Sequence, residues 1–380
     1  MHERLSRVFH KPSSFLRTAL FVYVFLIVYA SLYPLTGWRL PGESHFSFLF
    51  ESFPRYWTWF DIFVNIFAYI PLGFILVTAV SPLLRGSKAF LFALFAGSLL
   101  SLAMESLQVF LPGRVPSNID LLTNAGGTFI GAMAGVIFAP LIFRDDKVHH
   151  LVRSWLHFGS SRVLIIPALW PLAQIYPQNY LFGHGQILPH FSQWLSSILV
   201  TPGGQPFMLT GNLQLTAEQY WLSETIITST GMAGAILLLL CLLGQDAPRV
   251  TLALALFSTS IVTKIFAMAL LFEPSNAFVW VTPGAVGGIL TGILVIAGLV
   301  FVPAVIQRRM AIVMLLVSLI TVNILPDNQY FLSTLRMWSQ GKFLNFNGAA
   351  YFLACVWPYL ALWFLLRATR YAKKNDFGVL

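Results

Sequence analysis

The feature that most constrains this chain is the repeated occurrence of long apolar runs. The runs are roughly 18 to 25 residues long, and each is about long enough to cross the hydrocarbon core of a bilayer as an α-helix. Hydrophobic residues make up 57% of the 380 positions and charged residues only 10%, which excludes an ordinary water-soluble domain. Because lipid requires backbone polar groups to be paired within each segment, we expect an all-α, polytopic transmembrane helix bundle.

The spacing of the apolar runs predicts about ten transmembrane helices. One of them, 162–177, is short and is interrupted by Pro167 and Pro171. The predicted helices cover residues 16–35, 58–80, 89–111, 119–143, 162–177, 224–243, 250–272, 281–306, 310–325 and 348–366.

The basic residues predict how these helices are oriented. Loops rich in Lys and Arg alternate with loops that are poor in them, and cytoplasmic loops carry the basic excess in membrane proteins. The basic N-terminal and C-terminal segments then both face the cytoplasm, and a long loop near 178–223, without any Lys or Arg, faces outward. We therefore expect a multi-pass protein of the bacterial inner membrane.

The net charge of +9 does not indicate a nucleic-acid partner. The basic residues lie in short clusters between apolar runs, whereas a nucleic-acid-binding domain gathers them on one surface with aromatic residues. The sequence also contains no phosphate-binding loop, nucleophile motif or metal-ligand spacing, so we expect no cofactor and no metal.

Polar residues are concentrated in the first four predicted helices. An ionisable group within a membrane span costs a few kcal/mol, so its position normally has a reason. Each of three carboxylates has an amide one helical turn away, on the same helix face. The three pairs are Asp61 with Asn65, Glu105 with Gln108, and Asp120 with Asn124.

The predicted orientation places all six of these residues in the outer third of the membrane. The turn after the third helix is restricted by Pro112 and Pro116 and holds Arg114 beside the carboxylates. Two interpretations follow. In the structural interpretation, Arg114 pairs with Glu105 or Asp120 and fixes the hairpin between the third and fourth helices. In the functional interpretation, these polar residues form a pocket that holds a polar head group. The candidate ligand-binding residues are Asp61, Asn65, Glu105, Gln108, Arg114, Ser117, Asp120 and Asn124.

Three local patterns predict details of packing. Gly127 and Gly131 form a GxxxG pattern, which lets another helix approach closely. Thr216 and Gln219 have the spacing of a capping box ahead of the next span. Lys264 lies in the middle of a predicted span, where a snorkelling or inter-helix role is favoured over a proton relay.

The ordered segments FDIFVNIFAYIPLGF and ESLQVFLPGRVPSNIDLLTNAGGTFIG resemble the VanZ-like family of integral membrane proteins. The resemblance covers about residues 20–143, and the C-terminal part is similar to the longer proteobacterial members. It implies a VanZ-like four-helix module at 1–147 and an extension of about six helices at 148–380. The family commonly shows two acids at the start of its fourth helix, whereas Asn118 and Ile119 precede Asp120 here.

The resemblance implies a link to the cell envelope. The family takes its name from a protein associated with low-level resistance to teicoplanin, a glycopeptide antibiotic, which does not imply a known reaction. We therefore favour a non-enzymatic protein that recognises or handles a membrane lipid, a lipid-linked envelope precursor or a glycopeptide-type ligand at the outer leaflet, with antibiotic resistance as an associated phenotype.

Two alternative functions remain. A membrane-embedded enzyme would use Glu105 or Asp120 as a base on a lipid-linked substrate. A lipid transporter or flippase would need a polar path that continues to the inner side, but the inner halves of the second to fourth predicted helices are apolar and small.

Overall fold

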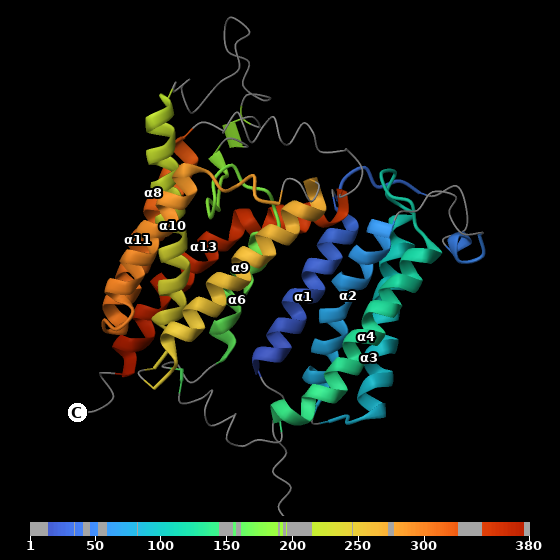
Figure 1. Cartoon of the computed structure of the whole chain (residues 1–380). Helices are drawn as coiled ribbons and strands as arrows, with labels where there is room; N and C mark the ends of the chain where they lie inside the picture. Colours follow the sequence, from blue (N-terminus) through green and yellow to red (C-terminus); the bar gives the residue numbers. More distant parts are fainter. Residues whose placement is uncertain are drawn as a thin grey trace, which may run out of the picture. The chain divides into compact units, whose positions relative to one another are not determined.

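The computed structural model is all-helical over the residues that it describes (Figure 1). Those residues form ten α-helices and two short 3-10 helices, with an isolated bridge between Leu156 and Leu243. The described residues are 14–33, 35–40, 46–51, 59–81, 83–143, 155–156, 161–188, 191–192, 195, 215–244, 246–272, 277–325 and 344–375.

The chain divides into two compact units. The first contains Met1–Ser154, Gly159–Ile165 and Lys342–Ala349, and the second contains the rest. The helices of the first unit are α1 (Ser14–Leu32), α2 (Trp59–Val80), α3 (Ser87–Gln108) and α4 (Asn118–Phe143). The second unit holds most of α6 (Ile165–Ala173), α8 (Ala217–Leu240), α9 (Arg249–Phe272), α10 (Pro283–Leu299), α11 (Ala304–Ile324) and most of α13 (Leu344–Asn375).

Eight of the described helices are long and apolar enough to cross a membrane, so the chain is a multi-pass helical membrane protein. The prediction of a full span at 162–177 is wrong. After a 3-10 turn at Ser161–Leu164, α6 has only nine residues and a length of about 14 Å, which cannot cross the bilayer. Pro171 lies inside α6, and the helix ends two residues later.

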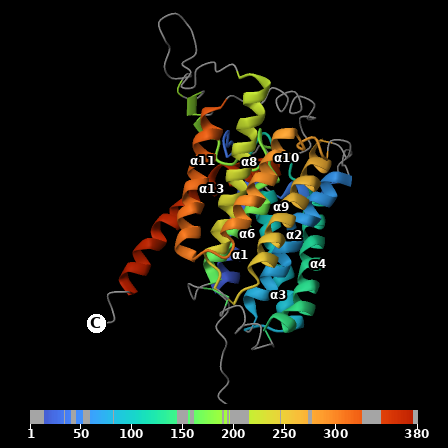
Figure 2. The ribbon, with the colours of Figure 1, turned by 60° about the vertical axis from the view of Figure 1, so that its left-hand side comes forward.

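The first unit is built around a close contact between α2 and α4, which lie side by side in Figures 1 and 2. A Cβ atom at Gly127 or Gly131 would collide with the carbonyl oxygens of Ile66 and Ile70 on α2. In return, Gly73 on α2 faces the backbone of Thr128. The expected close approach at the GxxxG pattern is thus confirmed, and α2 is the partner.

The structure corrects the start of the predicted outer loop in the second unit. Tyr180, Phe182 and His184 are at most 3% exposed, although their segment is not helical. The carbonyl of Gly185 accepts hydrogen bonds from Asn323 of α11 and from Tyr359 of α13, both at 2.9 Å. Irregular backbone can be buried here because neighbouring helices supply its hydrogen bonds.

The end of the predicted outer loop is corrected as well. The capping box between Thr216 and Gln219 is present, with both reciprocal hydrogen bonds, and it starts α8 at Ala217. The predicted span at 224–243 therefore began seven residues too late. Residues 196–214 of the predicted loop lie outside the described residues.

Candidate functional site

The predicted polar residues lie at the end of the first unit where α3 ends and α2 and α4 begin. The backbone N–H of Ser117, in the turn before α4, donates to Glu105 Oε2 of α3 at 2.9 Å. Asn65 Nδ2 of α2 donates to Asp120 Oδ1 in the first turn of α4, also at 2.9 Å. These two hydrogen bonds join the polar ends of three helices.

The three carboxylates of this end differ in exposure but share one electrostatic environment. Asp61 is exposed in the first turn of α2, Asp120 is partly buried, and Glu105 is only 3% exposed. Asp120 interacts electrostatically with both of the others. The N-terminus of α4 partly offsets this negative charge because its unpaired N–H groups favour an anion.

Arg114 is buried beside Glu105 but donates its hydrogen bonds to backbone carbonyls. Its Nη2 donates to the carbonyl oxygens of Tyr33 and, at 3.5 Å, of Ala30, which are among the last carbonyls of α1 and the turn after it. Burial lowers the pKa of Arg114 to about 10, while the negative charge of Glu105 opposes that change, so the guanidinium stays charged at neutral pH.

The predicted ion pair of Arg114 with Glu105 or Asp120 is therefore not the contact that fixes this turn. Within the described part of the chain, neither carboxylate forms an ion pair with Arg114. The end of α1 leaves carbonyl groups without helical partners, and a buried guanidinium satisfies them. Arg114 consequently ties the α3–α4 turn to α1.

Gln108 and Asn124 make contacts between helices. Gln108 Nε2 donates to the carbonyl of Ser31 in α1 at 2.9 Å. Asn124 Nδ2 donates to Ser101 Oγ in α3 at 2.9 Å, one helical turn deeper than Asp120. Ser117 has a local role, since its Oγ accepts from the N–H of Ile119 at 3.2 Å and begins α4.

The sequence interpretation missed two residues of this end. Tyr69 is 4% exposed and interacts electrostatically with Glu105 and Asp120. It follows Asn65 by four residues, so the helical spacing that grouped Asp61 with Asn65 would have found it. Asn118 Nδ2 donates to the carbonyl of Glu51, which belongs to a segment with no sequence pattern that predicts the contact.

Four buried polar atoms at this end have no hydrogen-bond partner among the described residues. They are Tyr69 Oη, Arg114 Nε, Asn118 Oδ1 and Asn124 Oδ1. Buried polar atoms are usually paired with protein or water, so unpaired ones mark places where a further polar molecule fits.

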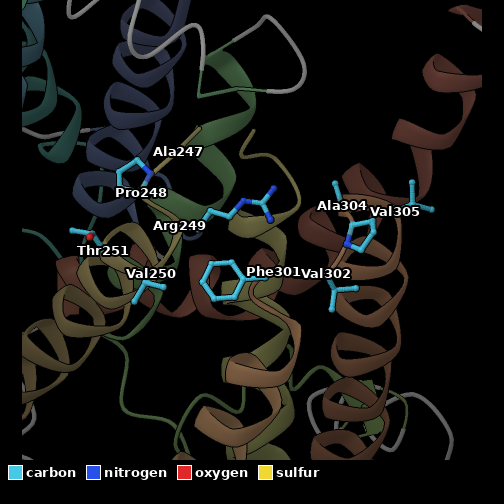
Figure 3. A pocket seen from close by; sticks show the side chains of 10 residues that line it. Ala247, Pro248, Arg249, Val250, Thr251, Phe301, Val302, Ala304 and Val305 are labelled. Atoms are coloured by element: carbon cyan, nitrogen blue, oxygen red, sulfur yellow. The ribbon is translucent and has the colours of Figure 1, made fainter. Parts of the chain in front are cut away.

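A pocket of about 750 Å³ lies in the second unit, and none of the predicted site residues lines it (Figure 3). It is formed where α9 begins and where the turn between α10 and α11 lies. Arg249, which lines it, donates to the carbonyls of Leu243, Gly244 and Val300. The lining residues are Ala247–Thr251 and Phe301–Val305.

The fold and the polar helix ends define a class: helical membrane proteins with a charged cluster at one end of a four-helix unit. Residues 18–141 match the family model described as VanZ/LLP1. The first third of the chain is therefore VanZ-like, as its sequence segments predicted. No curated protein and no solved structure matches the chain significantly.

Proposed function

We propose that the first unit recognises the polar head group of an envelope lipid, a lipid-linked precursor or a glycopeptide-type ligand, and that it does so without catalysis. The observation that supports this proposal is the convergence of Asp61, Glu105 and Asp120 at one end of the unit. The alternation of basic loops supports the proposed position of this end at the outer leaflet of a bacterial inner membrane, with both termini in the cytoplasm.

The charges of the cluster favour a ligand with a cationic group. Three carboxylates meet there, while Arg114 donates to carbonyls of the α1 end. In the described part of the chain, neither Glu105 nor Asp120 has an ion-pair partner. Carboxylates at a membrane border are stabilised by a nearby positive charge, so an amine-bearing head group fits best.

Lipid retention tests this proposal directly. The full-length protein is purified from membranes that contain ethanolamine and glycerol phospholipids, and the lipids that stay bound are quantified by mass spectrometry. We expect the wild type to retain the amine-bearing lipid selectively and Asp120→Asn to lose most of that selectivity. Glu218→Gln, which removes an exposed carboxylate at the start of α8, serves as the matched control.

The result that contradicts the proposal is equal retention of both lipids by the wild type, or the same selectivity in Asp120→Asn. If Asp120→Asn does not fold, Asp61→Asn takes its place. Asp61 is exposed, so the loss of its charge disturbs less packing. Selective retention of the glycerol lipid would also reject the expected amine recognition.

The enzymatic alternative rests on Glu105, whose buried carboxylate is held by the Ser117 N–H as a positioned base would be. Glu105→Gln keeps the shape of the side chain and removes its basicity. If the stably folded variant leaves the envelope phenotype of the wild type unchanged, Glu105 is not an essential base. Abolished function together with normal lipid retention would instead favour the enzyme.

A further inference from the structure

The second unit contains a buried lysine that no residue of its own helix neutralises. Lys264 is 2% exposed and lies on the buried face of α9, together with Ser260 and Met268. Of the two roles that the sequence favoured for Lys264, snorkelling and an inter-helix role, this burial agrees with the inter-helix role. Within the described residues Lys264 forms no hydrogen bond and no ion pair. A lone ammonium group in such a place costs free energy unless it meets an anion or loses its proton.

The carboxylates described in the second unit are placed elsewhere. Glu218 and Asp246 are exposed. Glu224 is 4% exposed, but it interacts with Thr282, the N-cap residue of α10, and lies against Gly284 in the first turn of that helix. The N-terminus of α10 thus accommodates Glu224. None of these three carboxylates serves as the counter-ion of Lys264.

Two arginines of this unit, Arg249, which is buried, and Arg308, which is partly buried, have carbonyl acceptors. Arg249 donates to three carbonyls at the end of α8 and the end of α10. Arg308 donates to the carbonyl of Leu365. Lys264 differs from both, because the described structure gives it no acceptor.

Lys264 lies beside the buried non-helical segment that follows α6. It interacts electrostatically with His184 of that segment, and Phe257, two turns earlier on α9, contacts Phe182 with ring centroids 6.4 Å apart. Phe182 has a φ of 59°, which is an unusual conformation for a residue with a bulky side chain. Strained, irregular backbone inside a membrane bundle is a common feature of binding sites.

His184 cannot serve as an anionic or acceptor partner for the lysine. Its Nδ1 donates to the carbonyl of Phe182 at 2.9 Å, and its Nε2 accepts from Gln174 Nε2 at 2.9 Å. Burial lowers the pKa of His184 to about 3, and the charge of Lys264 acts in the same direction, so the ring is neutral. Both ring nitrogens are therefore occupied.

The same cluster contains a second unpaired donor. Trp170 is fully buried and packs against Phe182, with ring centroids 5.0 Å apart, and against Trp357, at 6.3 Å. Its Nε1 has no partner among the described residues, and neither has the acceptor Gln174 Oε1. An anion would satisfy the ammonium group of Lys264, and the indole N–H and the amide oxygen are further polar groups of the same cluster that lack partners.

We propose that the second unit binds a small monovalent anion of chloride size at Lys264, within the cluster of Trp170, Gln174, Phe182, His184 and Trp357. The large side chains of this cluster are almost completely buried, so a ligand here must be small, which favours a monatomic anion. This proposal does not depend on the function proposed for the carboxylate cluster of the first unit.

Replacing the anion of the buffer tests the proposal on the full-length protein in lipid nanodiscs. The thermal midpoint is measured in sodium gluconate, and chloride then replaces gluconate at constant ionic strength. Chloride at about 100 times its dissociation constant should raise the wild-type midpoint by roughly 5 °C, and the rise should grow with the logarithm of the chloride concentration. Bromide should reproduce this effect, because it has the same charge and a similar size.

Lys264→Met should abolish the chloride response, because methionine keeps an unbranched side chain but carries no charge. Lys88→Met, at an exposed position in the first turn of α3, should respond like the wild type. An identical wild-type midpoint in chloride and gluconate overturns the proposal, as does a full response in Lys264→Met. If Lys264→Met does not fold, radioactive chloride binding to the wild type decides: about one saturable site per chain supports the proposal, and none rejects it.

Discussion

At the scale of single residues, Arg114 shows how one side chain can connect three helices. The residue lies in the turn between α3 and α4, and its hydrogen bonds reach the carbonyls at the end of α1. Gln108 reaches the same region through the carbonyl of Ser31. The end of α1 is thereby held by two side chains from the α3–α4 hairpin, so this end of the unit is fixed by polar contacts rather than by apolar packing alone.

We predict that Arg114→Gln destabilises the protein by about 2 kcal/mol, since hydrogen bonds from a charged, buried donor contribute more than neutral ones. Arg114→Lys should recover only part of this loss, because an ammonium group lacks the rigid planar geometry that holds Nη2 within reach of both carbonyls. The free energy of unfolding in mixed micelles measures both effects. Arg39→Gln, the same change at an exposed position, should stay within about 0.5 kcal/mol of the wild type. Equal losses at the two positions would contradict a capping role for Arg114.

At the scale of helices, the contact between α2 and α4 depends on particular glycines. A Cβ at Gly131 would collide with the carbonyl oxygen of Ile70, which is backbone and cannot move aside alone. Gly126 lies on the same helix, but a Cβ there would meet no atom within 4 Å. Two glycines five residues apart therefore have opposite expected responses to the same substitution.

We predict that Gly131→Ala costs about 1–3 kcal/mol, because α2 and α4 must separate to admit the methyl group. Gly126→Ala should instead stabilise the protein by about 0.5–1 kcal/mol, since alanine favours a helix and fits the space. Thermal unfolding of the two variants beside the wild type gives the comparison. Stabilisation by both substitutions would show that α2 and α4 do not pack as closely as the structure indicates.

The helices show which parts of the fold were predictable from sequence. Apolar runs located every α-helix that the structure describes, because burial in lipid leaves a continuous hydropathy signal. They could not show that the segment around Phe182 is buried among helices. That segment has no charge and no helical periodicity, and its burial depends on distant partners such as Asn323 and Tyr359.

The candidate site was predictable to a similar extent. Helical spacing grouped Asp61 with Asn65 and Asp120 with Asn124, because residues three or four apart share a face. Spacing gave no information on contacts between helices. The choice of Arg114 between a carboxylate and the carbonyls of α1 depends on where α1 ends in space, and no local pattern in the sequence contains that position.

At the scale of the whole molecule, the two units differ in the sign of their charged groups and in the partners of those groups. The first unit gathers carboxylates at one end of its helices, where they interact with one another. The second unit keeps its cations Arg249 and Arg308 on backbone carbonyls and leaves Lys264 without a described acceptor. The proposed ligands follow from this contrast: a cationic head group for the first unit and a small anion for the second.

The proposed orientation of the whole chain predicts which turns of the first unit are reachable from outside the cell. Val115, in the α3–α4 turn, is 84% exposed, and Leu83, in the α2–α3 turn, is 74% exposed. Single cysteines at these positions are placed in a parent in which Cys241 and Cys355 are replaced by alanine. Because the α2–α3 turn carries Arg85, it should face the cytoplasm.

A membrane-impermeant maleimide should therefore label Val115→Cys in intact spheroplasts, and it should label Leu83→Cys only after the membrane is opened. The two positions are matched in exposure, so a difference between them reports their side of the membrane and not their accessibility within the fold. The reverse pattern would put Asp61, Glu105 and Asp120 at the cytoplasmic leaflet. The carboxylate cluster would then face cytoplasmic lipids, and a role in recognising outer-leaflet envelope components would have to be given up.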